Sequence, residues 1–128
     1  MTLVLDSGGL PTLALQRARL DELRRRELWP AQVPIVVLTE ALTGDHRRDF
    51  HVNRLLRACQ LRPTDEAQAR EAARLRTATG RAGTISAVDA VVAAFASTRP
   101  DVLVLTSDPE DLTALVAHGT WPVTVVPV

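Results

Sequence analysis

Short apolar runs rich in β-branched residues alternate along this chain with longer stretches of helical periodicity. We expect strands in the short runs, at about 2–6, 34–39, 102–106 and 123–126. The longer stretches predict helices at 12–29, from Glu40 to Gly44, at 48–60, from Thr64 as N-cap to near Gly80, at 85–97 and from Asp108 to about 117. This alternation predicts an α/β fold, in which a parallel sheet carries helices on its faces.

The length and composition fit one domain, which we assign to residues 1–128. The chain is 46% hydrophobic, and 128 residues are enough for one core but not for two. No apolar run approaches the roughly 20 residues that span a bilayer, and the first residues lack the basic segment of a signal peptide. A single cysteine, Cys59, leaves no internal disulfide and no cysteine-based zinc site. We therefore expect a cytoplasmic protein that does not bind a membrane.

The charges of the chain sum to zero but are unevenly distributed. All 15 basic residues are arginines between Arg17 and Arg99, whereas residues 100–128 carry acids and no base. Without lysine the chain cannot contain a P-loop or a Schiff-base nucleophile. The arginines could form a phosphate-binding rim around an acidic centre, because guanidinium binds phosphate bidentately. Alternatively, arginine is simply the surface cation of this protein.

Four carboxylates stand at the edges of apolar segments that are far apart in the sequence. They are Asp6, Glu40, Asp89 and Asp108. Acids beside a core are unusual because an unpaired charge is penalised there, and the carboxyl ends of strands are where α/β sheets build sites. If the four converge, they form a cage of hard oxygen ligands for Mg²⁺ or Mn²⁺.

Asp89 has the weakest structural explanation of the four acids. On a helix it shares one face with Ile85, Val92 and Ala96, and its sequence neighbours are almost wholly apolar. A carboxylate in such surroundings must be paired, protonated or bound to a metal. Pairing with an arginine and metal binding both remain open, and we favour the metal.

The other three acids also have local structural explanations. Asp6 could form a turn with the backbone that follows it, Glu40 could lie in the first turn of a helix, and Asp108 could be a helix N-cap. We expect Asp111, one turn later, to act first as a capping-box acid and also as a further metal group. The metal hypothesis therefore depends on the four acids coming together.

No other catalytic set can be assembled from the sequence, because neither a Ser-His-Asp nor a Cys-His arrangement is evident. The three histidines, His46, His51 and His118, lack ligand-like spacing, and we place them on the surface. Cys59 lies on an apolar helix face and is expected in the core rather than as a nucleophile.

Four segments resemble, in their order and setting, the motifs of PIN domains, and specifically those of the VapC-type toxins of toxin–antitoxin pairs. They are Leu-Val-Leu-Asp-Ser-Gly-Gly-Leu at 3–10, Val-Val-Leu-Thr-Glu-Ala-Leu at 36–42, Ser-Ala-Val-Asp-Ala-Val-Val-Ala-Ala at 86–94 and Val-Leu-Thr-Ser-Asp-Pro-Glu-Asp-Leu at 104–112. The resemblance spans essentially the whole chain. It implies a PIN-like α/β/α sandwich with a central, mainly parallel sheet of four or five strands.

The resemblance also implies a function, which is metal-dependent endoribonuclease cleavage of RNA by the toxin of a VapBC-type pair. It implies that the catalytic acids and metal ligands are Asp6, Glu40, Asp89 and Asp108, with Mg²⁺ or Mn²⁺ as cofactor. The implied partners are an RNA substrate, a cognate antitoxin protein and a second copy in a homodimer. The leucine face of residues 10–28 could bind either protein partner. The alternatives are a PIN-fold RNA-processing nuclease without a toxin role and a catalytically inactive PIN-fold binding module.

Overall fold

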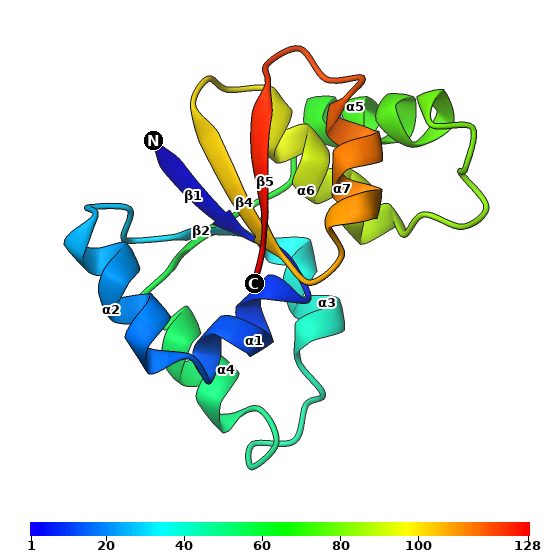
Figure 1. The fold of residues 1–128 in the computed structure, drawn as a ribbon. Helices are drawn as coiled ribbons and strands as arrows, with labels where there is room; N and C mark the ends of the chain where they lie inside the picture. Colours follow the sequence, from blue (N-terminus) through cyan, green and yellow to red (C-terminus); the bar gives the residue numbers. More distant parts are fainter.

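The computed structural model describes residues 1–128 and contains one sheet of five parallel strands (Figure 1). The strands are β1 (Thr2–Leu5), β2 (Gln32–Pro34), β3 (Gln60–Arg62), β4 (Val102–Thr106) and β5 (Val123–Pro127), in the spatial order β3-β2-β1-β4-β5. The helices are α1 (Gly9–Ala14), α2 (Arg17–Arg25), the 3-10 helix η1 (Ile35–Val37), α3 (Leu38–Ala41), α4 (Phe50–Leu56), α5 (Glu66–Ala78), α6 (Ala87–Ser97) and α7 (Pro109–Val116). The predicted α/β class and parallel sheet are confirmed.

β1 lies at the centre of the sheet, where side chains are covered on both faces. Its residues Leu3, Val4 and Leu5 are at most 1% exposed, as expected for a parallel strand between two layers of helices. β1 pairs in parallel with β4, with Leu5 opposite Leu105. The carboxyl ends of both strands therefore lie at the same edge of the sheet, and the residues that follow them become neighbours.

The helices form two layers, one on each side of the sheet (Figure 1). α6 packs against α5 and α7 in one layer, while α1 packs against α2 and α4 in the other. One hydrophobic cluster of 26 buried residues joins both layers to the sheet, and it includes Leu13 of α1 and Phe95 of α6. None of the helices is both long and apolar enough to cross a membrane.

The second strand lies earlier in the chain than predicted. We expected it at 34–39, whereas β2 ends at Pro34 and the next residues form η1 and α3. Proline lacks the N–H that a strand donates to its neighbour, which favours a strand end at this residue. The apolar run that follows still contributes to the core, because Val37 is fully buried. As a consequence, Glu40 stands on a helix rather than at the end of a strand.

The edge strand β3 has no signal in the apolar pattern. Its three residues, Gln60, Leu61 and Arg62, are all exposed, so the alternation that marks a half-buried strand is missing. The helix predicted at 48–60 is correspondingly shorter and ends at Leu56. Parallel pairing with β2, rather than burial, defines this strand.

Two further helix predictions are wrong in detail. The stretch 12–29 is not one helix, because the chain turns around Leu15 between α1 and α2. The N-cap of α5 is Asp65 rather than Thr64, and its carboxylate accepts a hydrogen bond from the Gln68 N–H at 2.8 Å.

Most of the leucine face of residues 10–28 belongs to the core. Leu10 and Leu13 are fully buried and Leu23 is 8% exposed, whereas Leu15 is the one leucine of the segment that is strongly exposed. Leu15 and the half-buried Leu20 and Leu28 are the part of this face left for an antitoxin or a second copy, and that binding stays a prediction.

Candidate metal centre

Five acidic side chains gather at the carboxyl edge of the sheet. Asp6 directly follows β1 and Asp108 follows the neighbouring strand β4. Asp89 comes from the first turn of α6, Glu40 from α3 and Asp111 from the first turn of α7. The charges of the other four acids all raise the pKa of Asp89. The four acids selected from the sequence therefore come together, and Asp111 joins them.

Three of these acids form the closest group. Asp89, Asp108 and Asp111 each offer a carboxylate oxygen, and these oxygens lie within 4.8 Å of one another. Asp89 and Asp111 are half-buried, while Asp108 is exposed. Asp6 and Glu40 do not belong to this closest group. The spacing is compatible with one cation that contacts three carboxylates.

Asp108 caps α7 as the sequence predicts, and Pro109 follows it in the first helical turn. The cap is a long hydrogen bond, in which Asp108 Oδ1 accepts from the Asp111 N–H at 3.4 Å. Asp111 does not complete a capping box, because the Asp108 N–H donates instead to Thr106 Oγ1 at 2.9 Å. The first role expected for Asp111 is therefore wrong, and its carboxylate remains available to the acidic group.

Asp6 is held by the backbone of the turn that follows it. Its Oδ1 accepts hydrogen bonds from the Gly9 N–H at 2.6 Å and the Gly8 N–H at 3.1 Å. Asp6 is only 2% exposed. Burial raises its pKa, the hydroxyl of Thr106 and the two N–H groups oppose that rise, and the charge of Asp108 adds to it. The turn interpretation of Asp6 is correct, and the same turn fixes the carboxylate beside the other acids.

The close approach of Gly9 to β4 explains why this turn contains glycine. A Cβ atom on Gly9 would lie 2.2 Å from the carbonyl oxygen of Leu105 and 3.1 Å from Asp6 Oδ1. Any side chain at this position would push α1 away from β4 or displace the Asp6 carboxylate. The glycine thereby allows a buried acid to stand at the sheet edge with its N–H donors in place.

Asp89 is the most strongly perturbed acid of the site. Its pKa is raised to about 7, first by burial and then by the charges of Asp6 and Glu40, with smaller contributions from Asp108 and Asp111. No arginine pairs with Asp89. Pairing with an arginine, one of the two explanations left open by the sequence, is therefore wrong.

Glu40 reaches the site from α3 through a contact with the end of β1. Its Oε1 accepts a hydrogen bond from Ser7 Oγ at 2.8 Å, and Glu40 itself is exposed. The bond joins residues that are 33 positions apart in the sequence. It places the Glu40 carboxylate on the solvent side of the site, where a ligand from solution could reach it.

Arg81 is the one cation paired with the acidic group, and the sequence did not single it out. Its Nη2 lies 2.6 Å from Asp111 Oδ1. The turn after α5 presents this side chain, because Gly80 has a positive φ of 70° and the Arg81 carbonyl accepts hydrogen bonds from the N–H groups of Thr84 and Ile85. No periodicity marks a residue in such a turn, so only the three-dimensional contact identifies it.

The nucleophile candidates elsewhere in the chain do not form a site. The Cys59 thiol donates to the carbonyl of Leu55 at 3.3 Å, and burial raises its pKa to about 12, so it stays protonated. His46, His51 and His118 are all exposed, as expected. Acidic oxygens are thus the reactive groups that the fold gathers.

The sequence profile of the PIN domain family matches residues 14–115. The chain belongs to the PIN domain family. The matched part begins after Asp6 and contains Glu40, Asp89, Asp108 and Asp111. No curated protein sequence matches the chain. PIN domains are nucleases that act on RNA and generally use a divalent metal, so membership implies a nuclease-type function.

The donor atoms of this PIN domain fit a hard divalent cation. They are carboxylate oxygens, which suit Mg²⁺ and Mn²⁺ and leave little affinity for soft metals. Three of them are close enough for one ion, and only Asp111 has a cationic partner. Burial, followed by the charges of the four neighbouring acids, raises the pKa of Asp89, and a bound cation would relieve the repulsion among these acids.

Proposed function

We propose that this PIN domain is a metal-dependent endoribonuclease and the toxin component of a VapBC-type toxin–antitoxin pair. The observation that carries the nuclease part is the convergence of acids around Asp89, whose pKa is raised to about 7 by burial and by its acidic neighbours. Family membership supplies the reaction class, which is hydrolysis of RNA. The toxin role is supported by the resemblance of the four acidic segments to VapC-type motifs.

The residues proposed to hold Mg²⁺ or Mn²⁺ and to act as catalytic acids are Asp6, Glu40, Asp89 and Asp108, with Asp111 as a further ligand. A divalent ion there would supply an activated water and stabilise charge on the scissile phosphate. The carboxylates surround the place where that charge develops. Their mutual repulsion keeps the site receptive to a cation, and this agrees with the raised pKa of Asp89.

The chain's own groups prepare this site before the substrate arrives. The N–H groups of Gly8 and Gly9 fix the orientation of the Asp6 carboxylate. Arg81 holds Asp111, and the remaining guanidinium N–H groups of Arg81 are free to contact a phosphate oxygen. The protein needs no side-chain nucleophile for hydrolysis, which agrees with the protonated state of Cys59.

Cleavage of cellular RNA by the purified protein tests the nuclease proposal. The reaction is run with Mg²⁺, with Mn²⁺ and with EDTA, beside an Asp6→Asn/Asp89→Asn variant. Glu110→Gln is the matched control, because Glu110 is an exposed acid of the α7 first turn outside the acidic group. We expect discrete metal-dependent products from the wild type and the control, and none from the double variant. Intact RNA despite calorimetrically confirmed metal binding would favour the inactive binding module.

Growth after induced expression tests the toxin role separately. Wild-type protein is expected to arrest growth, the Asp6→Asn/Asp89→Asn variant is expected to be harmless, and co-expression of a small protein encoded directly upstream is expected to restore growth. RNA cleavage in vitro without any growth effect would favour an RNA-processing nuclease. We also propose a homodimer, and light scattering of the purified protein at several concentrations measures that state.

A further inference from the structure

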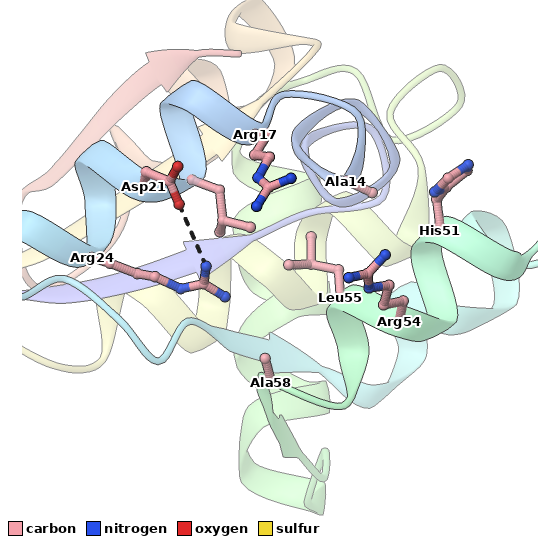
Figure 2. A pocket seen from close by; sticks show the side chains of 9 residues that line it. Ala14, Arg17, Asp21, Arg24, His51, Arg54, Leu55 and Ala58 are labelled. Atoms are coloured by element: carbon pink, nitrogen blue, oxygen red, sulfur yellow. Dashed lines mark ion pairs between the residues drawn. The ribbon is translucent and has the colours of Figure 1, made fainter.

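A cavity of about 260 Å³ lies between α2 and α4, separate from the acidic group. Its lining contains three arginines, namely Arg17 and Arg24 of α2 and Arg54 of α4. Leu20 and Leu55 form the apolar part of its wall. Figure 2 shows the three guanidinium groups facing the space between the two helices, while His51 points away from it. The helical spacing produces this arrangement, because residues 17, 21 and 24 share one face of α2, as do residues 51, 54 and 55 on α4, and Ala58 follows in the turn after α4.

The positive charge of this cavity is largely uncompensated within the protein. The side chains of Arg17 and Arg54 have no ion pair and no hydrogen bond in the structure. Arg24 has one acidic neighbour, Asp21, at a distance of 3.7 Å. The cavity thus carries three guanidinium groups and one acid, Asp21. Such a cavity attracts an anion, because like charges that line a concave surface concentrate the electrostatic field there.

The position of the cavity relates it to the acidic group. α1 begins three residues after Asp6 and ends at Ala14, which lines the cavity. A helix of this length spans roughly 9 Å. A nucleic-acid strand that has one phosphate at the acidic group can therefore reach the cavity within a few nucleotides.

We propose that the cavity between α2 and α4 is a phosphate-binding subsite for the RNA substrate, with Arg17 and Arg54 as its principal contacts. This inference rests on the proposed nuclease function and specifies how the same site holds its substrate. The planar guanidinium groups match phosphate oxygens bidentately, and the half-buried Leu20 offers apolar surface to the adjoining sugar. Acidic residues then bind the reacting phosphate through a cation, while arginines bind a neighbouring phosphate directly.

The test compares two double variants that remove equal charge from α2 and from α4 or its C-cap. Arg17→Ala/Arg54→Ala removes the cavity contacts. Arg25→Ala/Arg57→Ala is the control, because neither of these exposed arginines lines the cavity. Binding of a labelled single-stranded RNA is measured in EDTA at several salt concentrations. Metal-free binding does not depend on cleavage, so a failure of the catalytic proposal leaves this measurement interpretable.

We expect the cavity variant to bind RNA about tenfold or more weakly than the control, because contacts between charged groups are lost. Its slope of log affinity against log salt should fall by roughly 1.4, or about 0.7 for each lost contact with a single strand. Equal losses in the two variants would overturn the proposal. Binding of a short polyglutamate peptide to both variants is measured in the same way, because an acidic peptide is the alternative anionic ligand for the cavity. If its binding depends on Arg17 and Arg54 while RNA binding does not, the cavity is a peptide site and the proposal is wrong.

Discussion

Arg81 Nη2 and Asp111 Oδ1 form an ion pair at 2.6 Å that ties the turn after α5 to the first turn of α7. Asp111 is one of the three acids whose oxygens lie within 4.8 Å of one another, so a cation of the protein already occupies one side of the group. The pair partly offsets the repulsion among the acids, and it also competes with a metal for the Asp111 carboxylate.

Replacement of Arg81 by alanine should therefore have opposite effects on the free protein and on metal binding. We expect the free energy of unfolding without metal to fall by about 1 kcal/mol or less, since the pair is partly exposed. The affinity for Mg²⁺ should rise because the competing cation is gone. Calorimetric titration measures the affinity, with Arg70→Ala as the control because Arg70 pairs with Glu66 on the exposed surface of α5. An unchanged metal affinity would show that Asp111 is not a ligand.

The Asp89→Asn substitution should stabilise the metal-free protein at neutral pH. The folded-state pKa of Asp89 is raised to about 7 from an ordinary value of 3.8, so its ionisation opposes folding. We expect a gain on the order of 1 kcal/mol once solvent screening of a half-buried group is allowed for. Urea unfolding in EDTA gives the value, and a loss of stability in this variant would contradict the like-charge interpretation.

The pH dependence of stability follows from the same raised pKa. Between about pH 4 and 7 the folded protein keeps a proton on Asp89 that the unfolded chain has released. The unfolded state then binds fewer protons, so stability falls as the pH rises through this window. The free energy of unfolding of the wild type should therefore decrease between about pH 4 and 7 because of Asp89. The Asp89→Asn variant should not show this contribution to the decrease. Parallel curves for the two proteins would refute the assignment.

Metal binding should compete with this proton. Because a carboxylate must be ionised to bind a cation, the affinity for Mg²⁺ is expected to rise as the pH increases through about 7, where Asp89 loses its proton. The increase in melting temperature with added Mg²⁺ should therefore be larger at pH 8 than at pH 6. The same shift at both pH values would argue that the cation binds without Asp89.

Gly9 should not tolerate a side chain, whereas Gly83 should. A Cβ atom on Gly9 would lie 2.2 Å from the Leu105 carbonyl oxygen, while one on Gly83 would meet nothing within 4 Å. We expect Gly9→Ala to lower the free energy of unfolding by about 2 kcal/mol and to reduce RNA cleavage by displacing Asp6. Gly83→Ala should be close to neutral in both measurements. A fully active and stable Gly9→Ala protein would show that the Asp6 turn can shift without consequence.

The sequence was most informative where one local pattern serves both fold and site. Asp108 is recognisable as the N-cap of α7 because Pro109 follows it, and the cap position also places it after β4. Asp89 is recognisable because an acid interrupts the apolar face of α6. Gly8 and Gly9 after Asp6 indicate the turn that holds its carboxylate. Each of these signals lies within a few residues of the acid concerned.

The features that the sequence missed depend on contacts between distant or exposed segments. Arg81 meets Asp111 across 30 positions, and nothing near either residue indicates the pairing. Asp49 is 4% exposed and accepts hydrogen bonds from the N–H groups of Thr43 and Gly44 at 2.9 and 2.8 Å, which orders a loop that has no periodic pattern. β3 is an exposed edge strand, so its residues lack the alternation by which strands are recognised.

The acids around Asp89 are proposed to hold the metal with which this PIN domain cleaves RNA. The most direct test of that role is the cleavage rate of one defined RNA as Mn²⁺ is increased, for wild type, Asp89→Asn and Glu110→Gln. We predict saturable, metal-dependent cleavage by wild type and Glu110→Gln, and a loss of about 100-fold or more in Asp89→Asn, because several kcal/mol of charge stabilisation disappear. Cleavage by Asp89→Asn at the wild-type rate and with the same Mn²⁺ dependence would show that Asp89 does not hold the metal.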